Sequence, residues 1–328
     1  MNLFKTRKKM YLGFLLLGLI GIVGCAANDI NDRPLAGDRS DGADETDSQD
    51  PLMITTTIGM IADVVANIGQ EHVEVEALMG PGVDPHYYIA TQGDIRKLEE
   101  ADIVFYNGLY LEEGMEDILE QLGEQQPVIA VTQHIDKNVL LMDEEDLDEF
   151  DPHVWFNVKH WITVAETILE SLIEHDEINA DAYSANAESY ISELAALHEE
   201  IIEQIASIPR EQRFLVTAHD AFGYFGEAYD IEVIGLQGLN TASEYGAKDV
   251  TDLRDFLIEN EISTVFLESS VPPRGIEAVI EGARSLGHEI EIGGELFSDA
   301  MGEVGTEEGT YIGMIRYNVE TIVAALQQ

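Results

Sequence analysis

The chain has 328 residues, a formal net charge of −47 and a single cysteine. Such strong acidity excludes nucleic acids and anionic lipid surfaces as electrostatic partners. One cysteine excludes an internal disulfide and a zinc–thiolate site, so nitrogen and oxygen atoms must hold any bound metal.

The first 24 residues predict an export signal. Four basic residues between positions 5 and 9 precede an apolar run at 10–23, which is too short for an ordinary membrane-spanning helix. The run ends at Cys25 in a pattern that resembles a bacterial lipoprotein cleavage box, where the cysteine becomes the lipidated first residue. A plain signal peptide or a retained anchor is the alternative. Residues 25–50 are rich in Asp, Asn, Gly and Ser, which predicts a disordered acidic tether before the folded body.

Residues 51–179 alternate strand-like and helix-like segments. Apolar or alternating runs predict strands at 52–58, 73–78, 102–107 and 127–131. Apolar residues at helical spacing predict helices at 60–68, 93–100, 112–122 and 156–173. This order predicts an N-terminal α/β lobe with a parallel sheet covered by helices on both faces.

Residues 180–209 predict one long connecting helix, because apolar residues recur at steps of three and four until Pro209. At 1.5 Å per residue it would span about 40 Å. A coiled-coil seam is the alternative, but a strand pattern follows at once and the repeat does not continue.

Residues 210–328 repeat the pattern of the first lobe. The predicted strands are 214–218, 231–236, 264–268 and 289–292, and the predicted helices are 221–229, 247–259, 275–286 and 310–326. The expected fold is therefore α/β, with two lobes, each holding a parallel sheet flanked by helices, joined by one rigid helix. Ligands of open α/β sheets bind beyond the carboxyl ends of the strands, which here face a cleft between the lobes.

Four residues are expected at that cleft. His86 and His153 each follow Asp-Pro, a stiff turn that aims the imidazole outward, and His219 and Asp299 follow predicted strands of the second lobe. Three imidazoles and one carboxylate suit zinc, and accept manganese or iron with less preference. We expect affinity to fall as the pH drops through about 6.5, because protons compete for the rings. The other histidines are expected at the surface, namely 72, 134, 160, 175, 198 and 288.

Three acidic groups lie near these positions in the sequence. Asp84 and Asp151 are expected to bond to their own turns rather than to the metal. Glu268 is either a carboxylate that orients an imidazole or one that begins a helix. The acidic run at 143–151 precedes His153 directly. The overall acidity is typical of a saline or alkaline habitat, and a metal-gathering role is the alternative.

Six motifs in order carry a resemblance to a known family. They are DPHYY at 84–88, DPHVWF at 151–156, VTAHDAFGYF at 216–225, GLQGLN at 235–240, FLESSV at 266–271 and LFSDAM at 296–301. Together they resemble the zinc/manganese-binding receptors of ABC importers over residues 52–328. Two features depart from that pattern: Asn157 stands where the family often has Asp, and no long His-rich loop is present.

The resemblance implies a receptor that is not an enzyme, lipid-anchored through Cys25 on the outer face of the bacterial cytoplasmic membrane. It would capture Zn²⁺, or next Mn²⁺, and deliver it to an ABC permease and its ATPase. The implied ligands are His86, His153, His219 and Asp299, and a monomer without nucleic-acid partners is expected. A secreted metal-dependent hydrolase and a metal-binding surface adhesin remain as alternatives.

Overall fold

The computed structural model describes residues 50–142, 149–243 and 245–327. The predicted signal peptide, Cys25, nearly all of the tether and residues 143–148 of the acidic run lie outside the described residues.

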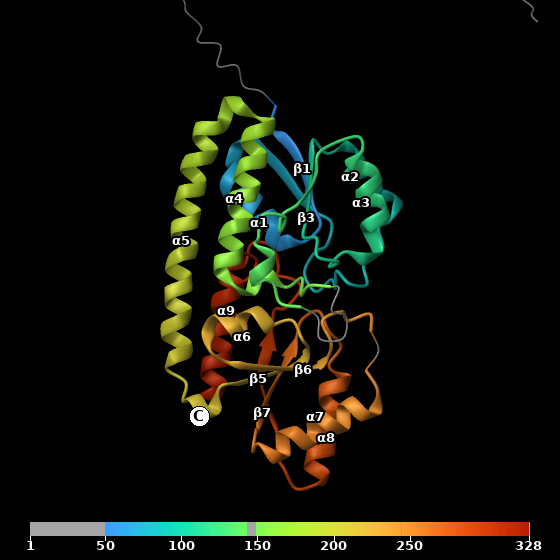
Figure 1. Ribbon diagram of the computed structural model, residues 1–328, viewed down its shortest axis with the longest axis vertical. Helices are drawn as coiled ribbons and strands as arrows, with labels where there is room; N and C mark the ends of the chain where they lie inside the picture. The colour runs from blue at the N-terminus through green and yellow to red at the C-terminus, as the bar shows by residue number, and fades with distance from the viewer. Residues whose placement is uncertain (1–49, 143–148, 244, 328) are drawn as a thin grey trace, which may run out of the picture. The chain divides into compact units, whose positions relative to one another are not determined.

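The N-terminal lobe is built on one parallel four-stranded sheet, in the order β2-β1-β3-β4. Figure 1 labels its two middle strands, β1 and β3. Its strands are β1 (Leu52–Thr56), β2 (Val73–Ala77), β3 (Ile103–Tyr106) and β4 (Val128–Ala130). Its helices are α1 (Gly59–Gly69), α2 (Gln92–Glu100), α3 (Glu116–Gly123) and α4 (Val158–His175). The first three residues of β3 are all buried, as expected for a strand covered on both faces. The sequence predicted each of these elements, with small differences at the ends.

The long helix α5 (Ala180–Ala206) has 27 residues and follows α4 in an antiparallel pair (Figure 1). Along its length it contacts α1 and α4 of the first lobe and α6 and α9 of the second. It therefore braces both lobes, as its apolar spacing predicted.

The C-terminal lobe contains two parallel strand pairs, β5-β6 and β7-β8, with β5 lying against β7. Its strands are β5 (Phe214–His219), β6 (Glu232–Gln237), β7 (Thr264–Glu268) and β8 (Glu291–Leu296). Its helices are α6 (Gly223–Tyr229), α7 (Ala247–Glu259), α8 (Arg274–Ser285) and α9 (Tyr311–Leu326). The last strand begins and ends later than the predicted 289–292, so its end approaches Asp299.

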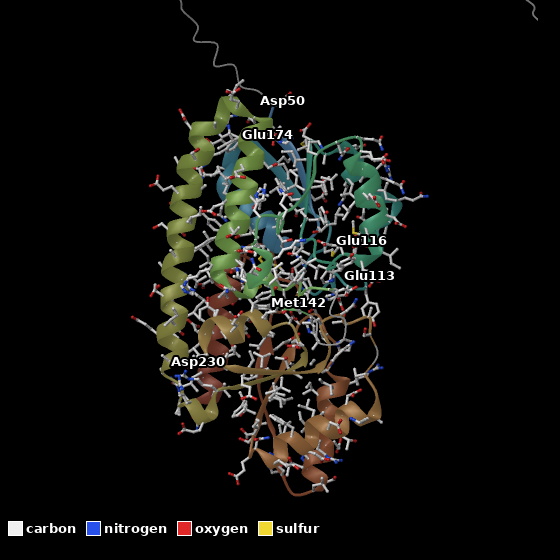
Figure 2. The ribbon with its side chains drawn as sticks, viewed as in Figure 1. Asp50, Glu113, Glu116, Met142, Glu174 and Asp230 are labelled. Carbon is white, nitrogen blue, oxygen red and sulfur yellow. The ribbon has the colours of Figure 1, made fainter. Side chains whose placement is uncertain are left out.

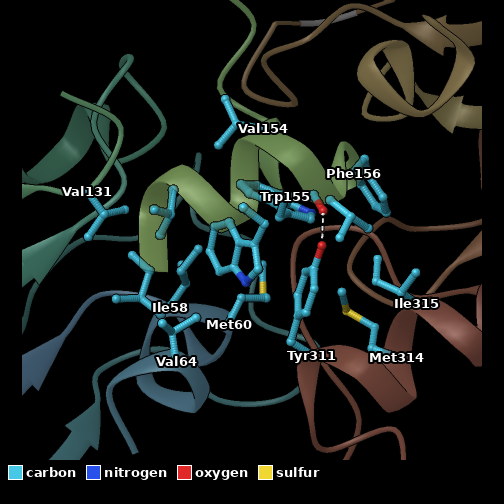
Figure 3. Packing of buried hydrophobic residues seen from close by; sticks show 14 of the residues in the cluster. Ile58, Met60, Val64, Val131, Val154, Trp155, Phe156, Tyr311, Met314 and Ile315 are labelled. Carbon is cyan, nitrogen blue, oxygen red and sulfur yellow. Dashed lines mark hydrogen bonds between the residues drawn. The ribbon is translucent and has the colours of Figure 1, made fainter. Parts of the chain in front are cut away.

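One hydrophobic core connects parts of the chain that lie far apart in the sequence. Residues of α1, the 3₁₀ turn Val154–Phe156 and α9 belong to the same buried cluster (Figure 3). Within it the Tyr311 hydroxyl donates to the Trp155 carbonyl at 2.7 Å. The start of the C-terminal helix is thereby fixed to the segment that carries His153.

The surface position expected for His198 is wrong, because this side chain is only 6% exposed. His198 lies one helical turn after Leu194, on the face of α5 that packs against the protein, and its Nδ1 is 3.1 Å from the Tyr229 hydroxyl. Among the described residues, no helix is both long and apolar enough to cross a membrane.

Candidate metal centre

His86 lies in the connection between β2 and α2. The Asp84 carboxylate accepts a hydrogen bond from the backbone N–H of His86 at 2.9 Å through Oδ1. This is the local Asp-Pro-His turn that the sequence predicted, and the imidazole at its end is 5% exposed.

His153 occupies the second turn of the same type. Asp151 Oδ1 accepts from the His153 backbone N–H at 2.9 Å and also lies 2.7 Å from its ring Nδ1. Asp151 therefore does more than close its own turn, since it turns the ring so that Nε2 faces the centre. A long connection separates His153 from the end of β4 and brings its turn to the ligand cluster.

His219 is the last residue of β5, and Glu268 is the last residue of β7. Glu268 Oε1 accepts from the His219 backbone N–H at 2.9 Å. Its Oε2 lies 2.5 Å from His219 Nδ1 in an ion-pair contact, with both side chains fully buried. Of the two readings of Glu268, the geometry favours the carboxylate that orients an imidazole.

Asp299 follows β8 and is 1% exposed. Its Oδ2 accepts a long hydrogen bond of 3.4 Å from the Ser270 hydroxyl, which also lies 2.8 Å from the Ser298 hydroxyl. Sequence reasoning missed these two serines. Ser270 could have been found by the same rule as His219, since it closely follows the end of a strand.

The four expected side chains gather at one point, where their ligand atoms all lie within 4.8 Å of one another. His86 Nε2 is 3.3 Å from His153 Nε2, and Asp299 lies 3.4 Å from His153 Nε2 through Oδ1 and 3.4 Å from His219 Nε2 through Oδ2. Bonds of 2.0–2.1 Å from a tetrahedral zinc ion would place ligand atoms about 3.3–3.4 Å apart. The donor set and its spacing therefore fit one divalent cation, and the two carboxylate oxygens also permit a fifth bond.

The pKa values of the three rings diverge because their neighbours differ. Burial lowers the pKa of His86 to about 3. Burial also disfavours a charged His153, but Asp151 and Asp299 outweigh it and raise its pKa to about 9. For His219, Glu268 and Asp299 outweigh burial and raise the pKa well above its usual value.

Asp299 shows the reverse balance. Burial opposes its charge, but His219 and His153 hold the pKa of its carboxyl well below the usual range. At neutral pH, His86 is thus ready to bind a metal, whereas His153 and His219 must first give up protons. Protons therefore compete with a metal above the expected pH of 6.5, because the pKa values of His153 and His219 are both raised.

The departure at Asn157 has a structural role away from the rings. Its side-chain oxygen accepts from the Lys159 backbone N–H at 3.0 Å and so caps the start of α4. Asn is among the preferred residues for this position, so the helix does not need Asp there.

The fold and the site together define a two-lobed binding protein with a cation-sized site between its lobes. Comparisons with known proteins agree. The chain matches the ZnuA family, described as zinc-uptake complex component A, periplasmic, over residues 54–325. It therefore belongs to that family.

Individual relatives cover most of the chain. It is 50% identical over 293 residues to the manganese-binding lipoprotein MntA of Bacillus subtilis, covering 89% of this chain and 95% of that protein. It is 47% identical over 274 residues to the zinc-binding protein TroA of Treponema pallidum, covering 84% of this chain and 88% of TroA. The solved structure of TroA from Treponema pallidum aligns with a TM-score of 0.83 at 46% identity, covering 85% of this chain and all of that structure.

Proposed function

We propose that this protein captures a divalent transition metal outside the cytoplasmic membrane and delivers it to an ABC permease, whose ATPase supplies the energy. In this proposal His86, His153, His219 and Asp299 are the metal ligands. Asp151 and Glu268 orient two of the rings, which is how carboxylates beside ligating histidines usually act.

The observation that carries the proposal is the burial of all four ligands, none of which is more than 5% exposed. A hydrolytic zinc site needs three protein ligands, an open position for water and a nearby base. Here a fourth protein group stands where the water would bind. The arrangement supports capture of the ion rather than metal-dependent hydrolysis of a substrate.

Zinc is the proposed preferred metal, and manganese the second. Three imidazoles favour zinc, and zinc lies above manganese in the general affinity order of nitrogen and oxygen sites. The relatives leave both metals in consideration, since MntA is named for manganese and TroA for zinc. The two carboxylate oxygens of Asp299, which both lie near ligand rings, support manganese as well, because they allow more than four bonds.

Anchoring and partners complete the proposal. Lipid on Cys25 would hold a monomer at the outer face of the membrane, and the residues at 26–50 would tether it. The names of several relatives support the lipid anchor and the ABC transporter, among them the substrate-binding lipoprotein of a metal ABC transporter in Streptococcus cristatus, which is 29% identical.

The test is metal analysis of protein purified from its own host, followed by zinc and manganese titrations at controlled pH. His153→Ala should lower the affinity for both metals by orders of magnitude. His175→Ala is the matched control, because His175 is an exposed histidine on α4 and its loss should change neither affinity. If the unaltered protein bound both metals with dissociation constants above about 1 mM, the proposal would be excluded.

A further inference from the structure

The two lobes meet differently on the two sides of the metal centre. On the His153 side, three buried hydrogen bonds cross between distant segments. The Trp155 indole N–H donates to the Ser298 carbonyl at 3.0 Å, the Tyr311 hydroxyl donates to the Trp155 carbonyl, and the Tyr224 hydroxyl donates to the Asp151 carbonyl at 2.9 Å. Aromatic side chains within the hydrophobic core make all three bonds, so this side is fixed.

The His86 side is held by short polar side chains. The Thr241 hydroxyl donates to Asp84 Oδ2 at 2.7 Å, and Thr241 is 3% exposed. A second contact joins the Asn240 amide to Glu113 Oε2 at 3.1 Å, but it is exposed to solvent (Figure 2 labels Glu113). Of these two contacts, the Asp84–Thr241 bond is the less exposed, with Thr241 buried and Asp84 half-buried, and Asp84 also accepts from the backbone of His86.

A cavity of about 490 Å³ lies directly beyond this bond. Polar residues line one part of it, which we call the polar cavity, namely Asp84, Thr241, Tyr87, Gln237, Ser243 and Tyr245, and apolar residues such as Leu236 and Val271 line the rest. Ala218 of β5 also lines it, so the cavity reaches the strand that ends at His219. Carboxylate, amide and hydroxyl groups can replace water around a hydrated cation.

A second cavity, of about 420 Å³, approaches the centre from Asp299. Its lining is mainly apolar, with Ile58, Ala62, Met79 and Met301 among its residues. The carboxylates of Asp63 and Glu76 also line it, but Tyr190 and Lys97 already pair with them. A hydrated divalent ion therefore loses contacts with water along most of this passage and gains few in return. Of these two cavities, the polar cavity is therefore the more favourable path.

We propose that the Asp84–Thr241 hydrogen bond is the gate of the metal centre, and that the polar cavity behind it is the passage through which the ion reaches and leaves its ligands. The gate opens the His86 side, while His153, His219 and Asp299 stay in place. This inference rests on the proposed metal-binding function and adds to it a residue that sets the rate of exchange.

Loss of the Asp84–Thr241 bond should change the rates of metal exchange in a way that loss of a metal ligand would not. Thr241 is not among the four ligands, so its bond to Asp84 affects the closed protein with and without metal in the same way. Breaking it lowers the barrier to uptake and release together. Because a hydrogen bond to a charged acceptor is worth about 1.5–3 kcal/mol, both rate constants should rise on the order of tenfold or more, with little change in Kd.

The experiment measures zinc association by stopped-flow tryptophan fluorescence, and dissociation by mixing the loaded protein with excess chelator. Trp155 is a suitable reporter because its ring lies 5.2 Å from that of His153. Thr241→Val should raise both rate constants, while Thr241→Ser, which keeps the hydroxyl, should restore values close to those of the unaltered protein. Unchanged rates in Thr241→Val, or a rise in Kd equal to the rise in release rate, would overturn the gate.

A second pair of variants tests the passage without disturbing the gate. Ser243→Phe places a ring in the polar cavity and should slow uptake and release, whereas Ala62→Leu fills the apolar cavity and should change neither. The opposite result would place the passage beside Asp299 and overturn the proposal. If the unaltered protein bound no zinc, the proposed function would fail instead, so the two failures are distinguishable.

Discussion

Glu268→Gln is the sharpest test of how the centre is tuned. Glu268 uses one carboxylate oxygen for the His219 backbone N–H at 2.9 Å and the other for His219 Nδ1 at 2.5 Å. Glutamine has nearly the same shape but a single acceptor oxygen, so one of the two N–H groups would face an amide NH₂. The variant also removes a negative charge from a fully buried position beside the metal.

The expected result is a 10–100-fold loss of zinc affinity, the usual effect of removing a carboxylate that supports a ligating histidine. This corresponds to about 1.4–2.8 kcal/mol. Competition against a chromophoric chelator at fixed pH measures it. Glu295→Gln, an exposed residue on the neighbouring strand β8, is the matched control and should bind like the unaltered protein. An affinity for Glu268→Gln within twofold of the unaltered protein would refute the orienting role.

Four further outcomes are expected. Because the pKa of His153 is raised to about 9 and that of His219 lies well above its usual value, both rings are protonated at pH 7. Zinc binding should then release about two protons, and zinc affinity should rise with pH toward 9. Calorimetry in buffers of different ionisation enthalpy measures the released protons, and a value of zero would contradict this prediction. Asp299→Ala should lower the affinity for zinc at least about 100-fold, because it removes a negative charge and opens one ligand position. An unchanged affinity in calorimetry would remove Asp299 from the site. Tyr311→Phe should lower the free energy of unfolding by about 1–2 kcal/mol in urea, because the Trp155 carbonyl loses its donor; an unchanged denaturation midpoint would argue against that bond. Zinc at about 100 times its Kd should stabilise the protein by about 2.7 kcal/mol, and chelation should reverse the gain in thermal melting; equal melting with and without zinc would contradict binding to the folded state.

The positions of most elements follow from local sequence patterns. The helix α5 is a clear case, because apolar spacing and Pro209 set both its face and its end. Strand ends were less predictable. The strand β8 runs to Leu296 rather than 292, since pairing with β7 extends it through two glycines that a sequence pattern does not mark as strand.

The sequence alone determined which four side chains could meet. The Asp-Pro-His turns at His86 and His153 are local structures, and parallel strands bring their carboxyl ends to one edge, which accounts for His219. That these residues hold the metal stays a prediction until a titration is made.

Only the tertiary structure decided how the rings are tuned and how they are reached. The contact of Glu268 with His219 joins residues 49 positions apart, and Thr241 meets Asp84 across 157 positions. No local pattern encodes such pairs, because they depend on how separate strands and loops pack against each other. The same packing gives three chemically identical imidazoles different pKa values, since burial and the nearest carboxylates differ for each ring.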